Sequence, residues 1–210
     1  MNKAFTLSEV LITLGIIGVV AALTLPAIVN NTNNKTLETS LKKSYSTIYQ
    51  ALNIYYAQNG EKITPENIGA HELKPILLKY MDVIDSEAKS VDDKTYKNYT
   101  GTSYVNRGFF YDGQFILKDG SLILLRNAGG NQLFISVDIN GPNKRPNQLG
   151  HDLFMFEINT KGELVPMGAK ETIYYNINDT WCSSTSTNAM NGAACTIKAV
   201  NEKDYFKKLL

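Results

Sequence analysis

The sequence is poor in the residues that build most metal centres and disulfide scaffolds. Its 210 residues include two Cys, two His and one Trp. Two cysteines allow at most one disulfide within the chain, so the sequence is not that of a small disulfide-stapled scaffold. The two histidines are far apart in the sequence, and neither lies in a Cys/His pattern typical of a zinc site.

Catalytic motifs and an excess of charge of one sign are also missing. The chain contains no GxSxG, no HExxH and no phosphate-binding loop. Its formal net charge is +1, which gives no electrostatic reason to expect binding to nucleic acid. We therefore expect a protein that is not an enzyme and carries no obligatory cofactor.

What the chain does have is a long apolar run at its beginning. From Phe5 to Val29 the only charged residue is Glu9. A helix of these 25 residues would be roughly 37 Å long, enough to cross the hydrocarbon core of a bilayer. The run is too long for a secretory signal peptide and is not followed by an A-x-A cleavage pattern. A plain membrane anchor, with Glu9 in water near the interface, is the simplest interpretation of hydropathy alone.

The same residues resemble a known family. The stretch KAFTLSEVLITLGIIGVVAALTLP is similar to the N-terminal signature of type IV prepilins and type II secretion pseudopilins. The resemblance implies cleavage between Ala4 and Phe5 by prepilin peptidase, followed by N-methylation of Phe5. It assigns Glu9 to filament assembly and Pro26 to a bend in the helix. Ala4 departs from the glycine usual before the cut, which implies slower cleavage.

The resemblance also implies partners and a location. The partners are prepilin peptidase, identical or related pilin subunits, an inner-membrane assembly platform and the lipid bilayer. The chain would cross the inner membrane once, with its C-terminal domain periplasmic or extracellular, and would later enter a filament. Within the membrane helix, Glu9 would be neutralised by the freed amino terminus of a neighbouring subunit. Small residues at Gly15, Gly18, Ala21 and Ala22 would allow close helix packing.

The rest of the chain is patterned like a soluble domain. After residues 1–4 (leader) and 5–29 (membrane helix), we expect an amphipathic helix within 30–60. Its apolar stripe recurs at steps of three and four residues and consists of Leu37, Leu41, Tyr45, Ile48, Leu52 and Tyr55. Residues 30–34 (NNTNN) would form a polar break or cap, and Gly60 would end the helix. Residues 61–105 would form a variable region that includes a short helix within 71–84. Residues 106–210 would form an antiparallel sheet and a C-terminal loop.

The expected sheet is a meander with tight turns. Two apolar runs surround Asp119-Gly120, a hairpin signal, and further strands are expected at 132–139 and 153–158. A short fifth strand would follow a turn at Lys161-Gly162. We expect the amphipathic helix to cover one face of this sheet and the other face to be wet. The predicted fold class is α+β and pilin-like, with the long N-terminal helix packed on the sheet.

An oxygen-rich loop between the third and fourth expected strands is a candidate metal site. It reads VDINGPNKRPNQLGHDLF and contains five residues with side-chain oxygens: Asp138, Asn140, Asn143, Asn147 and Asp152. Calcium takes six to eight oxygen ligands, and D-x-N-G resembles the start of an EF-hand loop, although the closing Glu of that motif is missing. The alternative is a turn in which Asn and Asp side chains cap backbone groups. The cations Lys144 and Arg145 in the middle of the loop favour this alternative.

Two cysteines enclose a loop of small residues near the C-terminus. Cys182 and Cys195 could form a disulfide, remain free or bind a metal, but there is no CxxC spacing and no nearby His cluster. Pilins commonly close a C-terminal loop in this way, so the resemblance favours the disulfide.

Three functions remain open from the sequence. The chain could be a subunit of a type II secretion pseudopilus, a type IV or competence pilus subunit, or a signal-anchored binding domain or enzyme that is not assembled. Both filament systems use the same signature.

Overall fold

The computed structural model describes residues 6–129, 132–175 and 177–209 and divides into two compact units, 1–36 and 37–210. Helix α1 (Leu7–Asn59) contributes to both units. Residues 30–34 are helical, so the expected polar break is absent and the helix continues through them. Asparagine lowers helix stability only modestly. The hydroxyls of Thr32 and Thr36 donate hydrogen bonds to the backbone carbonyls four residues earlier.

Helix α1 ends where the sequence predicts. Gly60 has φ +76° and donates its N–H to the carbonyl of Tyr56 at 2.9 Å. This left-handed conformation is the one in which glycine commonly terminates a helix.

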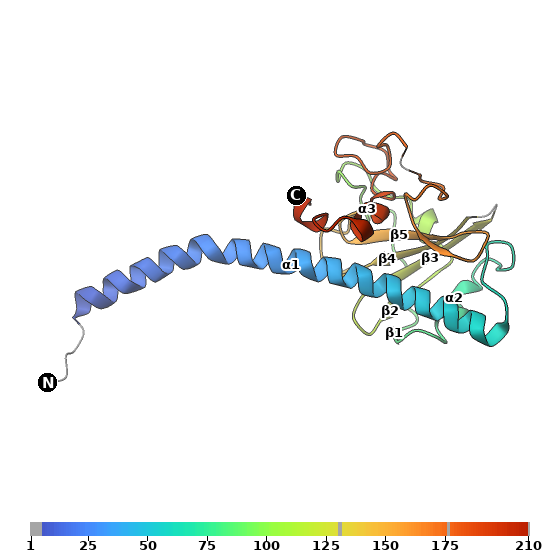
Figure 1. Cartoon of the computed structure of the whole chain (residues 1–210), viewed down its shortest axis with the longest axis horizontal. Coiled ribbons are helices and arrows are strands. Elements are labelled where there is room, and N and C mark those ends of the chain that lie inside the picture. The colour runs from blue at the N-terminus through green and yellow to red at the C-terminus, as the bar shows by residue number, and fades with distance from the viewer. Residues whose placement is uncertain (1–5, 130–131, 176, 210) are drawn as a thin grey trace. The chain divides into compact units, whose positions relative to one another are not determined.

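The second unit is built on a six-stranded antiparallel meander in the order β1-β2-β3-β4-β5-β6. The strands are β1 (Val83–Asp85), β2 (Gly113–Leu117), β3 (Leu122–Gly129), β4 (Gln132–Asp138), β5 (Leu153–Ile158) and β6 (Leu164–Pro166). The expected hairpin at Asp119-Gly120 joins β2 to β3, with Gly120 at φ +88°. The expected turn at Gly162 joins β5 to β6. Figure 1 shows this layout, which confirms the α+β pilin-like fold.

The amphipathic half of α1 covers one face of the sheet. Leu41, Ile48 and Ala51 are buried there, and the Tyr45 ring lies 5.5 Å from the Phe156 ring between centroids. These residues recur at helical spacing, so the apolar stripe read from the sequence is the face that packs on the sheet.

The opposite face of the sheet is buried too, which corrects the expectation of a wet face. A second apolar cluster joins Leu124, Phe134 and Met155 of the central strands to Tyr96 and Met190. Strands buried on both faces are apolar throughout rather than alternating, as β4 and β5 are. The covering layer comes from loops whose sequence has no periodicity.

Four short helical segments complete the fold of the described residues. The segment expected to be helical within 71–84 forms only α2 (Leu73–Leu77), and Ile84 belongs to β1 instead. At the C-terminal end, α3 (Cys195–Asn201) is followed by a 3₁₀ turn at Phe206–Lys208. Another 3₁₀ turn, Arg107–Phe110, precedes β2.

Candidate functional site

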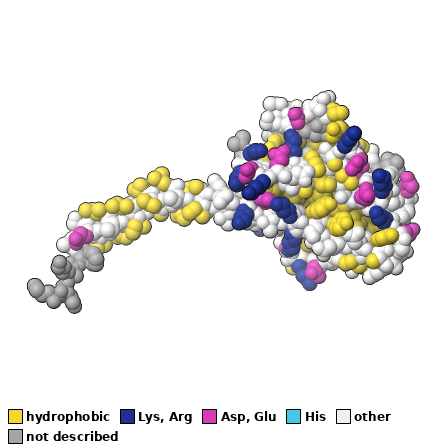
Figure 2. Space-filling view, in the orientation of Figure 1, with side chains coloured by type: hydrophobic (Ala, Val, Ile, Leu, Met, Phe, Trp, Pro, Cys, Tyr) yellow, Lys and Arg dark blue, Asp and Glu magenta, His cyan; other side chains and the backbone are white. Residues whose placement is uncertain are grey.

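The first unit exposes its apolar side chains. From Leu7 to Val29 the large hydrophobic side chains are 42–78% exposed in the isolated chain. Figure 2 shows hydrophobic side chains along this unit. Among the described residues, α1 is the one helix long and apolar enough to cross a membrane. Such a surface is stable only against lipid or another apolar partner.

Glu9, the acidic residue in this segment, caps the N-terminus of α1 together with Thr6. The N–H and the hydroxyl of Thr6 each donate to Oε2 of Glu9 at 2.8 Å, and the Glu9 N–H donates to Oγ1 of Thr6 at 3.3 Å. This reciprocal arrangement is a capping box of the T-x-x-E type. It holds the Glu9 carboxylate against the backbone N–H of Thr6.

Two further features of the segment concern close packing and helix geometry. Pro26 lies inside α1 and has no N–H to donate to the carbonyl one turn earlier. A Cβ built on Gly15 or Gly18 would meet no atom within 4 Å, so both positions present bare backbone to a partner. The predicted processing residues Ala4 and Phe5 lie outside the described residues.

Residues 1–25 match the family model described as the prokaryotic N-terminal methylation motif. The chain carries a type IV prepilin-like signature. No curated protein and no solved structure gave a significant match to the chain. The prepilin-like signature fits a membrane-anchored pilin.

Outside this signature, the oxygen-rich loop brings two carboxylates into the protein interior. Asp138 ends β4, Asp152 precedes β5, and both are fully buried. Oδ1 of Asp138 accepts the N–H groups of Asn140 at 3.3 Å and Gly141 at 2.9 Å. Oδ2 and Oδ1 of Asp152 accept the N–H groups of Asn147 at 2.8 Å and Gln148 at 2.6 Å. The two carboxylates therefore hold the two ends of the loop by capping its backbone, as the turn interpretation expects.

The environment of this pair disfavours two full negative charges. Burial, and then the charge of Asp152, raise the pKa of Asp138 to about 7, against the hydrogen bonds that stabilise its charged form. Burial also raises the pKa of Asp152. Among the described residues, none of the ion pairs involves either carboxylate.

The remaining predicted ligands divide into two groups. Asn140 lies at the pair: its N–H donates to Oδ1 of Asp138 at 3.3 Å, and its Nδ2 donates to the carbonyl of Arg145 at 3.4 Å. Asn143 is exposed, as are Lys144 and Arg145, so these cations do not enter the buried cluster. In the described part of the chain, no three His, Cys, Asp or Glu side chains form a metal-binding group.

Tyr96 is a member of this cluster that the sequence did not reveal. Its hydroxyl donates to Oδ2 of Asp138 at 2.7 Å, and its side chain is 1% exposed. Burial and then the charge of Asp138 raise the pKa of Tyr96. The two residues are 42 positions apart, and Tyr96 lies in a polar stretch without periodicity, so no sequence signal links them.

The two cysteines form the disulfide that the resemblance favours. Cys182 and Cys195 are bonded, with their Cα atoms 4.9 Å apart. A buried amide also organises the enclosed loop: Oδ1 of Asn191 accepts the N–H of Ser183 at 2.9 Å, and its Nδ2 donates to the carbonyls of Ser183 and Ser186 at 2.8 and 2.7 Å. The loop therefore has two independent constraints, one covalent and one polar.

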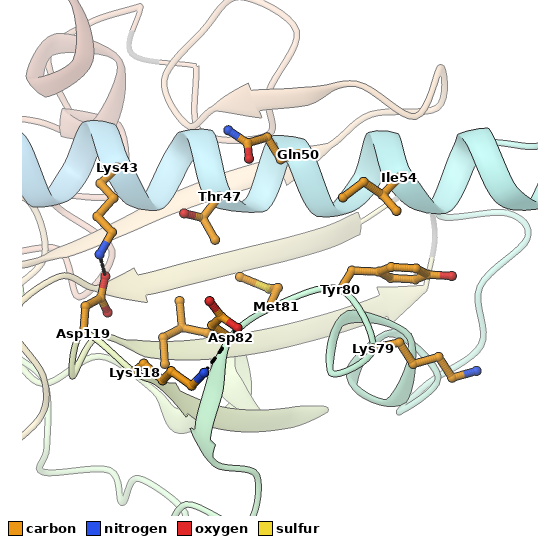
Figure 3. A pocket seen from close by; sticks show the side chains of 11 residues that line it. Lys43, Thr47, Gln50, Ile54, Lys79, Tyr80, Met81, Asp82, Lys118 and Asp119 are labelled. Carbon is orange, nitrogen blue, oxygen red and sulfur yellow. Dashed lines mark hydrogen bonds and ion pairs between the residues drawn. The ribbon is translucent and has the colours of Figure 1, made fainter.

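A surface groove of about 590 Å³ lies where α1 meets the β1–β2 edge of the sheet. Figure 3 shows Thr47 and Ile54 of α1 facing Met81 across it. Ion pairs link Lys43 to Asp119 at 2.7 Å and Lys118 to Asp82 at 3.5 Å within the lining. These two ion pairs compensate four of the charges that line the groove.

Proposed function

We propose that this protein is a prepilin-like structural subunit that is processed by prepilin peptidase and assembled into a type IV pilus-like filament or a type II secretion pseudopilus. The observation that carries the proposal is the methylation motif at residues 1–25, which covers the beginning of a membrane-length apolar helix. In this proposal the peptidase cuts between Ala4 and Phe5 and Phe5 is methylated.

The assembly step follows from the chemistry of the helix. Before assembly, lipid covers the exposed side chains of the first unit, and the folded second unit lies on the periplasmic or outer side of the inner membrane. During assembly, related subunits replace lipid around these helices, and the bare backbone at Gly15 and Gly18 allows close approach. The freed amine of Phe5 on a neighbouring subunit neutralises Glu9 and sets the axial register.

The described residues support a structural rather than a catalytic role for the second unit. Its buried ionisable cluster around Asp138 is held by backbone and phenol hydrogen bonds. We therefore propose that the protein is not an enzyme and acts through the inner-membrane assembly platform and its fellow subunits.

Intact-mass measurement and N-terminal sequencing test this proposal. The full chain is produced in cells with and without prepilin peptidase. We expect a chain that begins at methylated Phe5 in the first case and an uncut Met1 terminus in the second. An uncut terminus in cells with an active peptidase would favour a signal-anchored domain that is not assembled.

A further inference from the structure

Parts of the second unit that are far apart in the sequence meet at one end of its sheet, around the β2–β3 turn. Lys43 of α1 forms an ion pair with Asp119 of this turn at 2.7 Å. Gly141, at the start of the β4–β5 loop, lies so close to the turn that a Cβ on it would clash with a backbone carbonyl there. The C-terminal segment reaches the same end, because the Phe206 ring lies 5.7 Å from the ring of Phe154 near the start of β5.

This part of the second unit, which we call the basic end, exposes eight cations: Lys42, Lys43, Lys118, Lys144, Arg145, Lys203, Lys207 and Lys208. Five carboxylates accompany them, and each forms an ion pair with one of these cations: Glu38, Asp82, Asp119, Glu202 and Asp204. The ion pairs of the described residues do not include Lys144, Arg145 or Lys203.

The rest of the second unit carries the opposite balance. Outside the basic end, residues 37–210 hold eleven cations and fourteen carboxylates. The formal charges of this unit therefore cancel as a whole, but its excess of positive charge lies at one end. Figure 2 shows Lys and Arg side chains gathered on the second unit beside the start of its part of α1.

The chain itself holds the basic end near the bilayer. Because α1 is helical throughout, Lys43 lies about 21 Å along it from Val29, the last residue of the apolar run. The headgroup layer extends about 5–8 Å beyond the hydrocarbon core. The apolar run is longer than this core is thick, so the helix is expected to tilt, which lowers the second unit towards the headgroups. The gap that remains is of the order of the Debye length, about 10 Å, so the charges of the two surfaces interact.

We propose that the basic end binds the headgroups of anionic phospholipids and holds the second unit of an unassembled subunit on the membrane surface. Arg145 suits a phosphate because a guanidinium can donate two parallel hydrogen bonds to it, and Lys144 and Lys203 add point charges. These three cations come from two separate segments, an arrangement that fits a surface of many mobile phosphates. Each basic side chain close to an anionic surface strengthens binding about fivefold. The inference rests on the membrane anchoring in the proposed function, but not on cleavage or assembly.

Native mass spectrometry of the uncut full chain in detergent micelles tests the proposal. The micelles contain equal amounts of phosphatidylglycerol, which is anionic, and phosphatidylcholine, which has no net charge, and the lipids retained by the protein are counted. We expect phosphatidylglycerol to be retained at least about fivefold over phosphatidylcholine. This preference should fall as the ionic strength is raised from about 0.1 to 0.5 M, because salt screens the attraction.

Matched charge reversals separate the basic end from the net charge of the chain. The double variant Lys144→Glu with Arg145→Glu should lower the preference for phosphatidylglycerol at least about fivefold. The control, Lys62→Glu with Lys161→Glu, makes the same change in net charge at exposed residues in and beside the β5–β6 turn, and it should retain the parent preference. All four side chains are exposed, so near-ultraviolet circular dichroism of both variants should match that of the parent chain.

Three results would overturn the proposal. The first is equal retention of the two lipids by the parent chain. If carbodiimide then cross-links Lys144 to a carboxylate of a second copy, the basic end is a contact between subunits instead. The second is a preference that Lys144→Glu with Arg145→Glu leaves unchanged, and the third is an equal loss of preference in the control variant. Failure of prepilin peptidase to cut the chain would contradict the proposed processing and leave these lipid measurements unaffected.

Discussion

The disulfide-closed loop allows a direct comparison of its covalent and polar constraints. The bond between Cys182 and Cys195 closes a loop with a sequence separation of 13. The chain-entropy model assigns such a closure about 3 kcal/mol. For a domain of this size, each kcal/mol shifts Tm by about 2–4 °C, so replacing both cysteines with alanine should lower Tm by roughly 6–12 °C.

The amide of Asn191 provides a comparable constraint. Its side chain is fully buried and makes three hydrogen bonds, each worth about 1 kcal/mol. Asn191→Ala should therefore lower Tm by about as much as loss of the disulfide. Both variants are measured by thermal unfolding of the full chain in detergent, with Ser184→Ala, at an exposed position of the same loop, as the control.

Two results would refute this reasoning. If the cysteine-free variant unfolds within about 1 °C of the parent chain, the bridge does not restrict the unfolded state as the entropy model requires. If Asn191→Ala is as neutral as Ser184→Ala, the buried hydrogen bonds contribute nothing net. If each constraint compensates for loss of the other, removal of both should lower Tm by more than the sum of the two single effects, which a double-mutant cycle measures.

Three further predictions concern other parts of the chain. Glu9→Gln preserves the capping box but removes the charge, so we expect it to prevent assembly into polymers as fully as Glu9→Ala does. A normal yield of polymer from correctly cleaved Glu9→Gln protein would contradict neutralisation of Glu9 by a neighbouring subunit. Burial raises the pKa of Glu157, although a hydrogen bond from the Ile173 N–H to its carboxylate opposes this shift. The contribution of Glu157 to the free energy of unfolding is therefore present at low pH and is lost as the pH rises through the raised pKa. Glu157→Gln should thus be more stable than the parent at pH 8 and equal to it below about pH 4 in Tm measurements, and equal Tm at pH 8 would refute this. Ile48→Ala, on the buried face of α1, should lower the free energy of unfolding by about 2–5 kcal/mol in thermal unfolding, and a loss below about 1 kcal/mol would mean that the helix repacks.

Local signals in the sequence predicted the parts of the fold that local chemistry controls. Gly60 terminates α1 and Asp119-Gly120 forms a hairpin because both depend on backbone conformations that glycine adopts readily. The apolar stripe of α1 identified its buried face because helical spacing is independent of the partner. The disulfide was favoured from the resemblance and is formed.

Features that depend on distant contacts were missed. The second face of the sheet is covered by loops that contribute single residues, such as Tyr96 and Met190, and these have no pattern of their own. Strand β1 is three residues long and forms by pairing with β2, so its sequence looked like the continuation of a helix. The sequence identified Asp138 and Asp152 as members of an oxygen-rich loop but did not predict that both are buried. Only the structure shows that Asn147 hydrogen-bonds Asp152 while Asn143 is exposed.

The two outermost strands of the sheet restrict how the protein can associate. β1 and β6 each contain three residues, and β6 finishes at Pro166, which lacks an amide hydrogen. Such blunt margins give a foreign strand little backbone to pair with. Growth of a polymer by sheet extension is therefore disfavoured, and the exposed apolar N-terminal helices are the elements suited to subunit contacts. The same short edge strands disfavour aggregation of unassembled subunits through their second units at high local concentration.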